Sequence, residues 1–231
     1  MLRSIALVTM AAVVLVAAGC SGDDEQKPNG PLPDAAGLLS DASESAAKIT
    51  STHFVVTTTG TVPGLAVKSI DGDLTAEGEK VAAKGTAKLE LMGSIAEGKF
   101  VLVDGTLYLD PGSGSYQEFP EEQAKTIYDF SAVLDPERGV AKLISSIEGA
   151  KTVAADEVGG VATYKIDGTA TKETIAGLVP QASADVKVSL WVTADGHEPV
   201  QVAATFPGKP GGKLTVTLSK VNEPVTVEPP A

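Results

Sequence analysis

The feature that most constrains this chain is a two-residue alternation of apolar and polar side chains, which recurs from residue 52 almost to the C-terminus. In the run 186–192 every even-numbered residue is aliphatic, and the odd-numbered residues are Lys, Ser and Trp. The runs 86–91, 200–206 and 213–218 alternate in the same way. Because successive side chains of a strand point to opposite faces, each run predicts a strand with one buried and one mostly solvated face. We therefore expect a sheet with one apolar face that other elements must cover.

About ten antiparallel strands are expected from these patterns. Turns that contain glycine separate them, and Asp104-Gly105 between two apolar runs is the strongest hairpin signal in the chain. Gly159-Gly160 joins two later runs in the same way. The predicted strands are 52–62, 65–76, 80–92, 94–103, 106–110, 150–156, 161–168, 185–193, 198–206 and 213–220.

Three other segments have the spacing of helices. Apolar residues recur at helical intervals over 35–50, and Asp34 can cap this helix at its N-terminus. Residues 121–148 carry short apolar groups, and Pro136 can open a helix there. A short helix is expected near 171–179. The sum is an α+β fold, in which a single antiparallel sheet has its helices on one face.

The N-terminus is typical of a lipoprotein signal. Residues 1–19 contain one cation, Arg3, and an apolar middle shorter than the roughly 20 residues that a mature membrane helix needs. Cys20, the single Cys of the chain, follows in the position that is diacylated in bacterial lipoproteins. A short membrane anchor, or an ordinary signal with an unrelated Cys, is the alternative. We expect a lipoprotein signal peptide at 1–19, an acylated Cys and flexible tether at 20–33, and a single domain at 34–231 on the extracytoplasmic (periplasmic) face of the cell membrane.

Composition excludes several classes of function. The 231 residues include 18 Lys and Arg against 30 Asp and Glu, a net charge of −12, so no nucleic-acid partner is expected. One Cys and two His cannot form a Cys-rich zinc site, and Asp71-Gly72-Asp73 is predicted to be a turn without the other ligands of a calcium loop. No Gly-x-Ser-x-Gly motif accompanies His53 or His197. We therefore expect no metal, no cofactor and no catalysis.

The apolar face permits two outcomes. Only 4% of the residues are aromatic, so small aliphatic side chains must fill the interior. They can close into a tight core, which is favoured because unfilled volume costs about 24 cal/mol per Å³. They can also leave a cavity for an apolar ligand. From the residues alone both alternatives stay open, and Trp191, out of phase with the apolar face, is expected to cap a sheet edge or to face a partner.

Several short sequence motifs occur in a fixed order along nearly the whole chain. They are 30–34, 62–65 with 72–74, 100–108, 127–129, 133–136, Gly139, Trp191 and 218–220. In this order they resemble the mycobacterial-type LppX/LprA/LprF/LprG lipoproteins, and LprG-like members most closely. The resemblance implies a strongly bent antiparallel half-barrel with helices on its concave face, enclosing an apolar pocket.

The same resemblance implies a function. It predicts a monomeric, non-enzymatic carrier of triacylated glycolipids, of the lipoarabinomannan or phosphatidylinositol mannoside type, and of triacylglycerides. Such a carrier moves its lipid toward the outer envelope and works with a major-facilitator efflux transporter. A lipoprotein that scaffolds a transporter or cell-wall complex is the alternative, and an esterase or glycosidase is a more distant one. One pocket-lining strand position of the family falls on Ala87. The predicted lining residues are Phe54, Val56, Ala87, Leu89, Leu91, Phe100, Leu102, Leu143, Ile147, Val188, Leu190, Val202 and Leu218.

Overall fold

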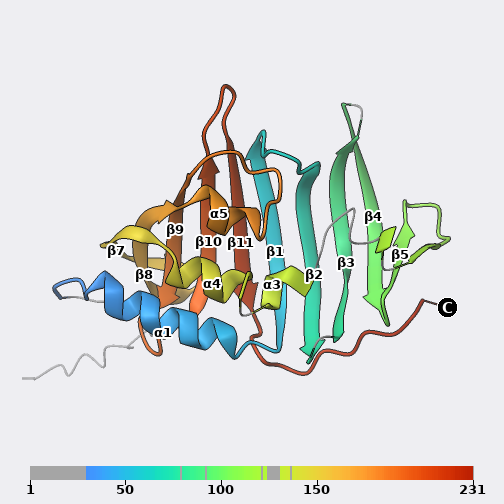
Figure 1. The fold of residues 1–231 in the computed structure, drawn as a ribbon. Helices are drawn as coiled ribbons and strands as arrows, with labels where there is room; N and C mark the ends of the chain where they lie inside the picture. The colour runs from blue at the N-terminus through green and yellow to red at the C-terminus, as the bar shows by residue number, and fades with distance from the viewer. Residues whose placement is uncertain are drawn as a thin grey trace, which may run out of the picture.

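One open antiparallel sheet of eleven strands forms the frame of the protein (Figure 1). The computed structural model describes residues 30–78, 80–91, 93–120, 122–123, 131–135 and 137–230. The strands are β1 (Ser51–Gly60), β2 (Val67–Glu77), β3 (Lys80–Leu91), β4 (Ser94–Val103), β5 (Thr106–Asp110), β6 (Gln117–Pro120), β7 (Glu148–Val158), β8 (Val161–Ala170), β9 (Val186–Thr193), β10 (Pro199–Phe206) and β11 (Gly212–Ser219). The helices are α1 (Ala35–Ala47), α3 (Ser131–Leu134), α4 (Val140–Ser145) and α5 (Lys172–Ala176).

The order of the strands is set by one long-range pairing. The sheet order is β6-β5-β4-β3-β2-β1-β11-β10-β9-β8-β7, so β1 lies in the middle and joins an N-terminal half to a C-terminal half. Phe54 of β1 lies opposite Leu218 of β11 and opposite Gly72 of β2. The predicted fold, an α+β domain built on one antiparallel sheet with helices, is confirmed.

Helix α1 begins where the sequence predicts it. The carboxylate of Asp34 accepts hydrogen bonds from the backbone N–H groups of Ala36, at 3.0 Å, and Gly37, at 3.2 Å. These bonds satisfy two of the donors that a helix N-terminus leaves unpaired. The helix ends at Ala47, three residues before the predicted end at residue 50.

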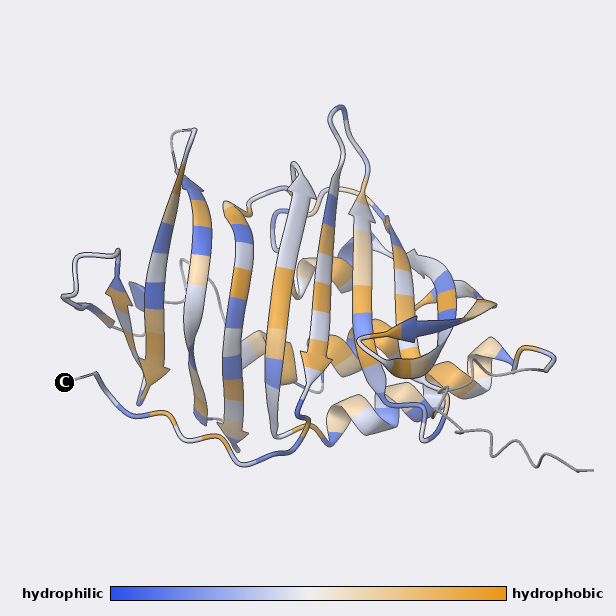
Figure 2. Cartoon of the chain, turned by 180° about the vertical axis from the view of Figure 1, so that it is seen from behind, coloured by the Kyte–Doolittle hydropathy of each residue, from blue (hydrophilic) through white to orange (hydrophobic). Residues whose placement is uncertain are grey.

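The described helices lie on one side of the sheet, which we call the inner face: α1, α4 and α5 cover its C-terminal half, and the short α3 packs against the cluster of the N-terminal half. Figure 1 shows α1, α4 and α5 in front of the strands β7–β11, while β3 and β4 have no described helix in front of them. The view from behind in Figure 2 shows the opposite, outer face, which is free of described helices. The two halves of the inner face are therefore withdrawn from water in different ways.

The apolar side chains form two separate clusters. The larger one joins α1, α4 and α5 to β8–β10, and Ile144, Ile166 and Leu190 within it have 0% exposure. The smaller one has Phe54, Leu74, Ala83, Phe100 and Leu107 at its centre, all from β1–β5. The residues packed around this second centre are only partly buried: Val56, Ile70, Val81, Ala87, Leu102, Leu109, Phe119, Val133, Leu134 and Leu218.

Two local predictions from the sequence are wrong. Asp71-Gly72-Asp73 is not a turn but lies inside β2, where Gly72 pairs with Gly85 of β3. Trp191 does not lie at a sheet edge, because β9 runs between β8 and β10.

The surroundings of Trp191 explain its position out of phase with the apolar face. Its side chain is 8% exposed on the outer face, so it is not free to face a partner. The indole N–H donates to Asp156 at 3.0 Å, and the ammonium of Lys165 lies 5.2 Å from the ring centroid. Asp156 and Lys165 of the same chain therefore cover the polar edge and the face of the indole ring.

The region 121–148 differs from the prediction in detail. Its described part contains α3 and α4, and Gly139 is the N-cap of α4, so that helix does not open at Pro136, a residue outside the described set. The short strand β6 was not predicted. The signal peptide 1–19, Cys20 and most of the tether also lie outside the described residues, so those predictions stay predictions.

Paired glycines let an aromatic ring lie across the N-terminal half of the sheet. Gly72 and Gly85 lie opposite each other, and Gly85 is also opposite Phe100. A Cβ atom on Gly85 would lie 2.3 Å from the carbonyl oxygen of Asp71 and 3.0 Å from Phe100 Cε1. No side chain fits there without displacing the backbone of β2.

We predict that Gly85→Ala lowers the free energy of unfolding by about 1–3 kcal/mol, because the added methyl overpacks the strand pair. The matched control is Gly37→Ala in α1, where a Cβ meets nothing within 4 Å. That variant should gain about 0.5–1 kcal/mol from helix propensity. Urea unfolding followed by circular dichroism measures both. An unchanged urea midpoint for Gly85→Ala would contradict the conclusion that no side chain fits at this position.

Candidate functional site

The strand members of the predicted lining set share the inner face. Phe54 lies opposite Leu218, and Val202 lies opposite Leu190. Ala87 lies opposite Ile70 of β2, which belongs to the same apolar surface. The side chain of Leu91 lies outside the described set.

Four of the predicted residues are fully part of the helix-covered core. Leu143, Ile147, Val188 and Leu190 have exposed fractions between 0% and 8% and pack among the side chains of α1, α4 and the C-terminal strands. Val202 is partly buried against the same cluster. These side chains already have protein neighbours in place of water.

The remaining residues surround the second cluster. Phe54 and Phe100 are buried at its centre, with exposed fractions of 8% and 4%. Four further members, Val56, Ala87, Leu102 and Leu218, are only half-buried around that centre, and Leu89 is half-buried on β3. This sheet half thus keeps part of its apolar surface accessible.

Small residues gather on the inner face of β2–β4. Ala83, Gly85 and Ala87 of β3 share this face with Gly72 of β2 and Gly98 of β4. On the corresponding face of β8 and β9, Ile166 lies opposite Leu190 and Gly168 lies opposite Val188. The side chains of β3 itself therefore fill little volume at Ala83, Gly85 and Ala87.

The outer face of the same strands carries a polar hollow of about 380 Å³. Its charged side chains come from alternating positions that are out of phase with the apolar ones, and Gly72, Gly85 and Phe100 complete the lining. We did not predict it from the sequence, because only the register of four strands brings these residues together. The hollow is lined by His53, Asp71, Gly72, Asp73, Lys84, Gly85, Thr86, Lys99, Phe100, Val101 and Tyr116.

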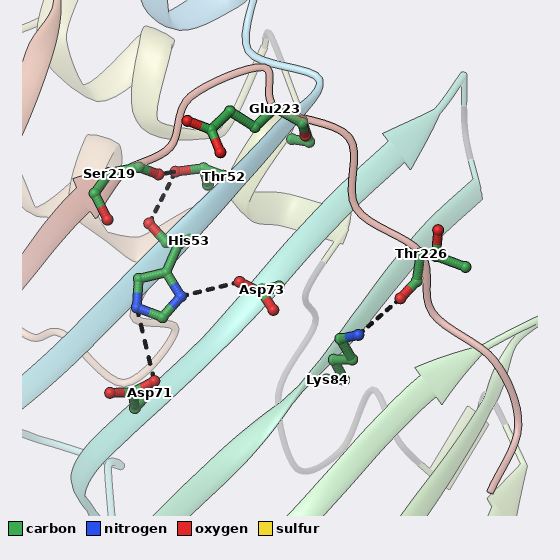
Figure 3. A network of polar contacts seen from close by, with 9 residues as sticks. Thr52, His53, Asp71, Asp73, Lys84, Ser219, Glu223 and Thr226 are labelled. Carbon is green, nitrogen blue, oxygen red and sulfur yellow. Dashed lines mark hydrogen bonds and ion pairs between the residues drawn. The ribbon is translucent and has the colours of Figure 1, made fainter.

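An imidazole that lies between two carboxylates lines this hollow (Figure 3). His53 Nδ1 lies 2.9 Å from Asp73 Oδ1, and His53 Nε2 lies 3.7 Å from Asp71 Oδ1. The other histidine, His197, lies in the turn after β9 and contacts Asp41 of α1 at 2.7 Å. The two histidines belong to separate polar clusters, so they do not combine into one catalytic group.

The loop that leads to Tyr116 is held by one carboxylate. Asp110 accepts hydrogen bonds from the backbone N–H groups of Gly112, at 2.9 Å, and Gly114, at 3.0 Å. Burial raises the pKa of Asp110, but hydrogen bonds from Gly114, Gly112 and Ser113 outweigh that effect and leave the pKa below its usual range. The ionised carboxylate therefore stabilises the loop.

Within the described residues, no group of three or more His, Cys, Asp or Glu side chains is arranged to hold a metal ion. The same part of the chain contains no helix that is both long and apolar enough to span a bilayer.

Residues 34–227 match the family model of the LppX_LprAFG lipoproteins. The chain belongs to this lipoprotein family. The lipoarabinomannan carrier protein LprG of Mycobacteroides abscessus is 36% identical over 232 residues, which are 98% of this chain and 97% of that protein. LprG of Mycolicibacterium smegmatis is also 36% identical, over 97% of this chain and 93% of that protein.

Solved structures agree with the fold. The crystal structure of LprF from Mycobacterium bovis superimposes with a TM-score of 0.76 and 26% identity, covering 85% of this chain and 97% of that one. LppX from Mycobacterium tuberculosis, at 22% identity and a TM-score of 0.65, covers 84% of this chain and 98% of that one, and it supports the fold alone. The family resemblance predicted from the sequence is confirmed.

We predict that the two apolar clusters respond differently to truncation. Leu190→Ala, in the helix-covered cluster, should lower the free energy of unfolding by about 2–5 kcal/mol, because it opens a cavity in a filled core. Leu218 lies on the same face but is half-buried, so Leu218→Ala should lower the free energy of unfolding by clearly less. Urea unfolding of both variants measures the difference. Equal losses would mean that the second cluster is packed as tightly as the first.

Proposed function

We propose that this lipoprotein is a lipid carrier that holds acyl chains against the inner face of β1–β5. The observation that carries the proposal is the contrast between the two apolar clusters. Helices α1, α4 and α5 bury the inner face over β8–β10, whereas Val56, Leu102 and Leu218 stay half-buried around the second cluster, which only the short α3 among the described helices contacts. A hydrocarbon chain placed there would cover surface that the described protein leaves accessible to water.

The energetics favour this role without any catalytic step. Each CH₂ group removed from water contributes about 0.8 kcal/mol, so several long chains provide a large driving force. A saccharide headgroup can remain in water while the chains are bound. Transfer of a lipid between membranes needs no covalent chemistry, and we accordingly propose no enzymatic activity.

The names of the relatives support the cargo that we propose. Proteins that are 36% identical over nearly the whole chain are named lipoarabinomannan carriers. We extend this to triacylated glycolipids of the lipoarabinomannan or phosphatidylinositol mannoside type, and to triacylglycerides. As partner we propose a major-facilitator efflux transporter, which would receive or supply the lipid, with the carrier itself a monomer.

The proposed binding surface is narrower than the set predicted from the sequence. Direct contact with acyl chains is assigned to the half-buried residues and to the aromatic rings beneath them. Leu143, Ile147, Val188 and Leu190 are assigned to the supporting core, because they are enclosed by the helices. The contact residues are Phe54, Val56, Ala87, Leu89, Phe100, Leu102 and Leu218, with Val202 packed against the other cluster.

Ala87→Trp is predicted to abolish lipid loading, because the indole would occupy the space proposed for an acyl chain. The matched control is Lys88→Trp, which places the same ring on the exposed outer face one residue later. Both variants, without the acylated N-terminus, are purified from an actinobacterial host and extracted, and mass spectrometry counts bound lipid per protein. We expect bound triacylated lipid in the parent and in Lys88→Trp, and less than a tenth of it in Ala87→Trp.

Thermal unfolding of each variant checks that the fold is kept. Equal lipid content in Ala87→Trp and the parent would show that the pocket is misplaced. No lipid in any of the folded proteins would end the carrier proposal.

Acylation of Cys20 is predicted to anchor the protein on the extracytoplasmic face of the cell membrane. Two or three acyl chains on one residue give stable attachment, whereas a single chain is marginal. Cys20→Ala should lose metabolic label from radioactive palmitate and should leave the membrane fraction. Retention of Cys20→Ala in the membrane would instead indicate an uncleaved helical anchor. The unchanged protein in the same host serves as the positive control.

A further inference from the structure

The polar hollow on the outer face lies on the opposite side of the sheet from the proposed acyl-chain surface. Cross-strand register builds it in two rows. In one row His53 lies opposite Asp73, and Asp73 lies opposite Lys84. In the second row Asp71 lies opposite Thr86, and Thr86 lies opposite Lys99. The lining therefore alternates carboxylates with ammonium and hydroxyl groups.

The size of the hollow suits a small ligand. Its volume of about 380 Å³ lies toward the lower end of the range of about 300–1,000 Å³ typical of small-molecule sites. Gly72 and Gly85 lie at its floor, where the absence of side chains leaves the backbone accessible. The hollow is open to solvent, so water-soluble groups can enter without any movement of a helix.

The charges of the lining balance. Two carboxylates, Asp71 and Asp73, face two ammonium groups, Lys84 and Lys99. A divalent cation would be repelled by the lysines, and an anion would be repelled by the aspartates. A neutral ligand whose groups both donate and accept hydrogen bonds matches this set, since hydroxyls can donate to a carboxylate and accept from an ammonium. Tyr116 adds an aromatic ring beside them.

Several of these groups are held in place before any ligand arrives. The His53 imidazole is fixed between Asp73 and Asp71, as Figure 3 shows. The ammonium of Lys84 donates to the backbone carbonyl of Thr226, in the C-terminal segment, at 2.8 Å. Groups that are already ordered lose less conformational entropy on binding.

We propose that the hollow between His53, Asp71, Asp73, Lys84, Lys99 and Tyr116 is a second binding site, specific for neutral polyols of the saccharide class. Asp71 and Asp73 accept hydrogen bonds from sugar hydroxyls, Lys99 donates to them, and Tyr116 packs against the apolar side of the ring. Lys84 and His53 fix the geometry of the site. The charged side chains of the site point to the face of the sheet opposite the acyl-chain surface, while Gly72, Gly85 and Phe100 border both.

The test is a titration of ¹⁵N-labelled protein with methyl α-mannoside and methyl α-glucoside, followed by two-dimensional NMR. We expect millimolar affinity, with shift changes confined to the amides of the residues that line the hollow. Asp71→Asn and Lys99→Met should each weaken binding by about tenfold, since each removes a charge-assisted hydrogen bond. Lys187→Met, an exposed outer-face lysine on β9 outside the hollow, should bind as the parent does.

Unchanged cross-peak positions elsewhere in the spectrum confirm that each variant is folded. Two variants at separate positions keep the test decisive if one of them unfolds. No shift change at 100 mM sugar would overturn the proposal. So would equal binding by the parent, Asp71→Asn and Lys99→Met, or shifts at the hollow with inorganic phosphate or Ca²⁺ in place of sugar.

Discussion

The inner face of the sheet has to be withdrawn from water, and the arrangement of the other elements follows from that requirement. Apolar burial is the main favourable term in folding, at roughly 25 cal/mol per Å². Helices α1, α4 and α5 satisfy it over the C-terminal half, where Ile166 and Leu190 have no exposed surface. Over the N-terminal half the described protein satisfies it only in part, since Leu102 and Leu218 remain half-buried. A bound hydrocarbon chain would complete the burial.

Small inner-face residues on β2–β4 have two consequences that oppose each other. Gly72 and Gly85 let Phe100 approach the backbone, which anchors the second cluster. The same glycines supply no side-chain volume of their own, and unfilled volume normally costs stability. The second cluster is therefore expected to contribute less to stability than the helix-covered one. The pairing of β1 with β11 joins the two halves of the sheet. The well-packed C-terminal half can therefore offset the lower stability of the N-terminal half.

Residue patterns predicted the strands and the first helix well, because these depend on local alternation and on the cap at Asp34. They failed where tertiary contacts decide. Asp71-Gly72-Asp73 has the composition of a turn, yet Gly72 lies in a strand because Phe100 packs against it. The short strand β6 has no alternation long enough to be detected. The division of the predicted lining residues between a filled and a half-open cluster depends on where the helices lie, which no local pattern contains.

The polar hollow and the apolar surface share one structural cause. Both are built by the same four strands, and a shift of the register by one residue would exchange the two faces. The pairing of Gly85 with both Gly72 and Phe100 works against such a shift, because a larger residue at Gly85 would meet the backbone of β2. A single packing arrangement on the inner face therefore also keeps His53, Asp73 and Lys84 in one row on the outer face. The sheet thus carries an apolar surface and a hollow of charged side chains back to back, separated by the thickness of one layer of backbone.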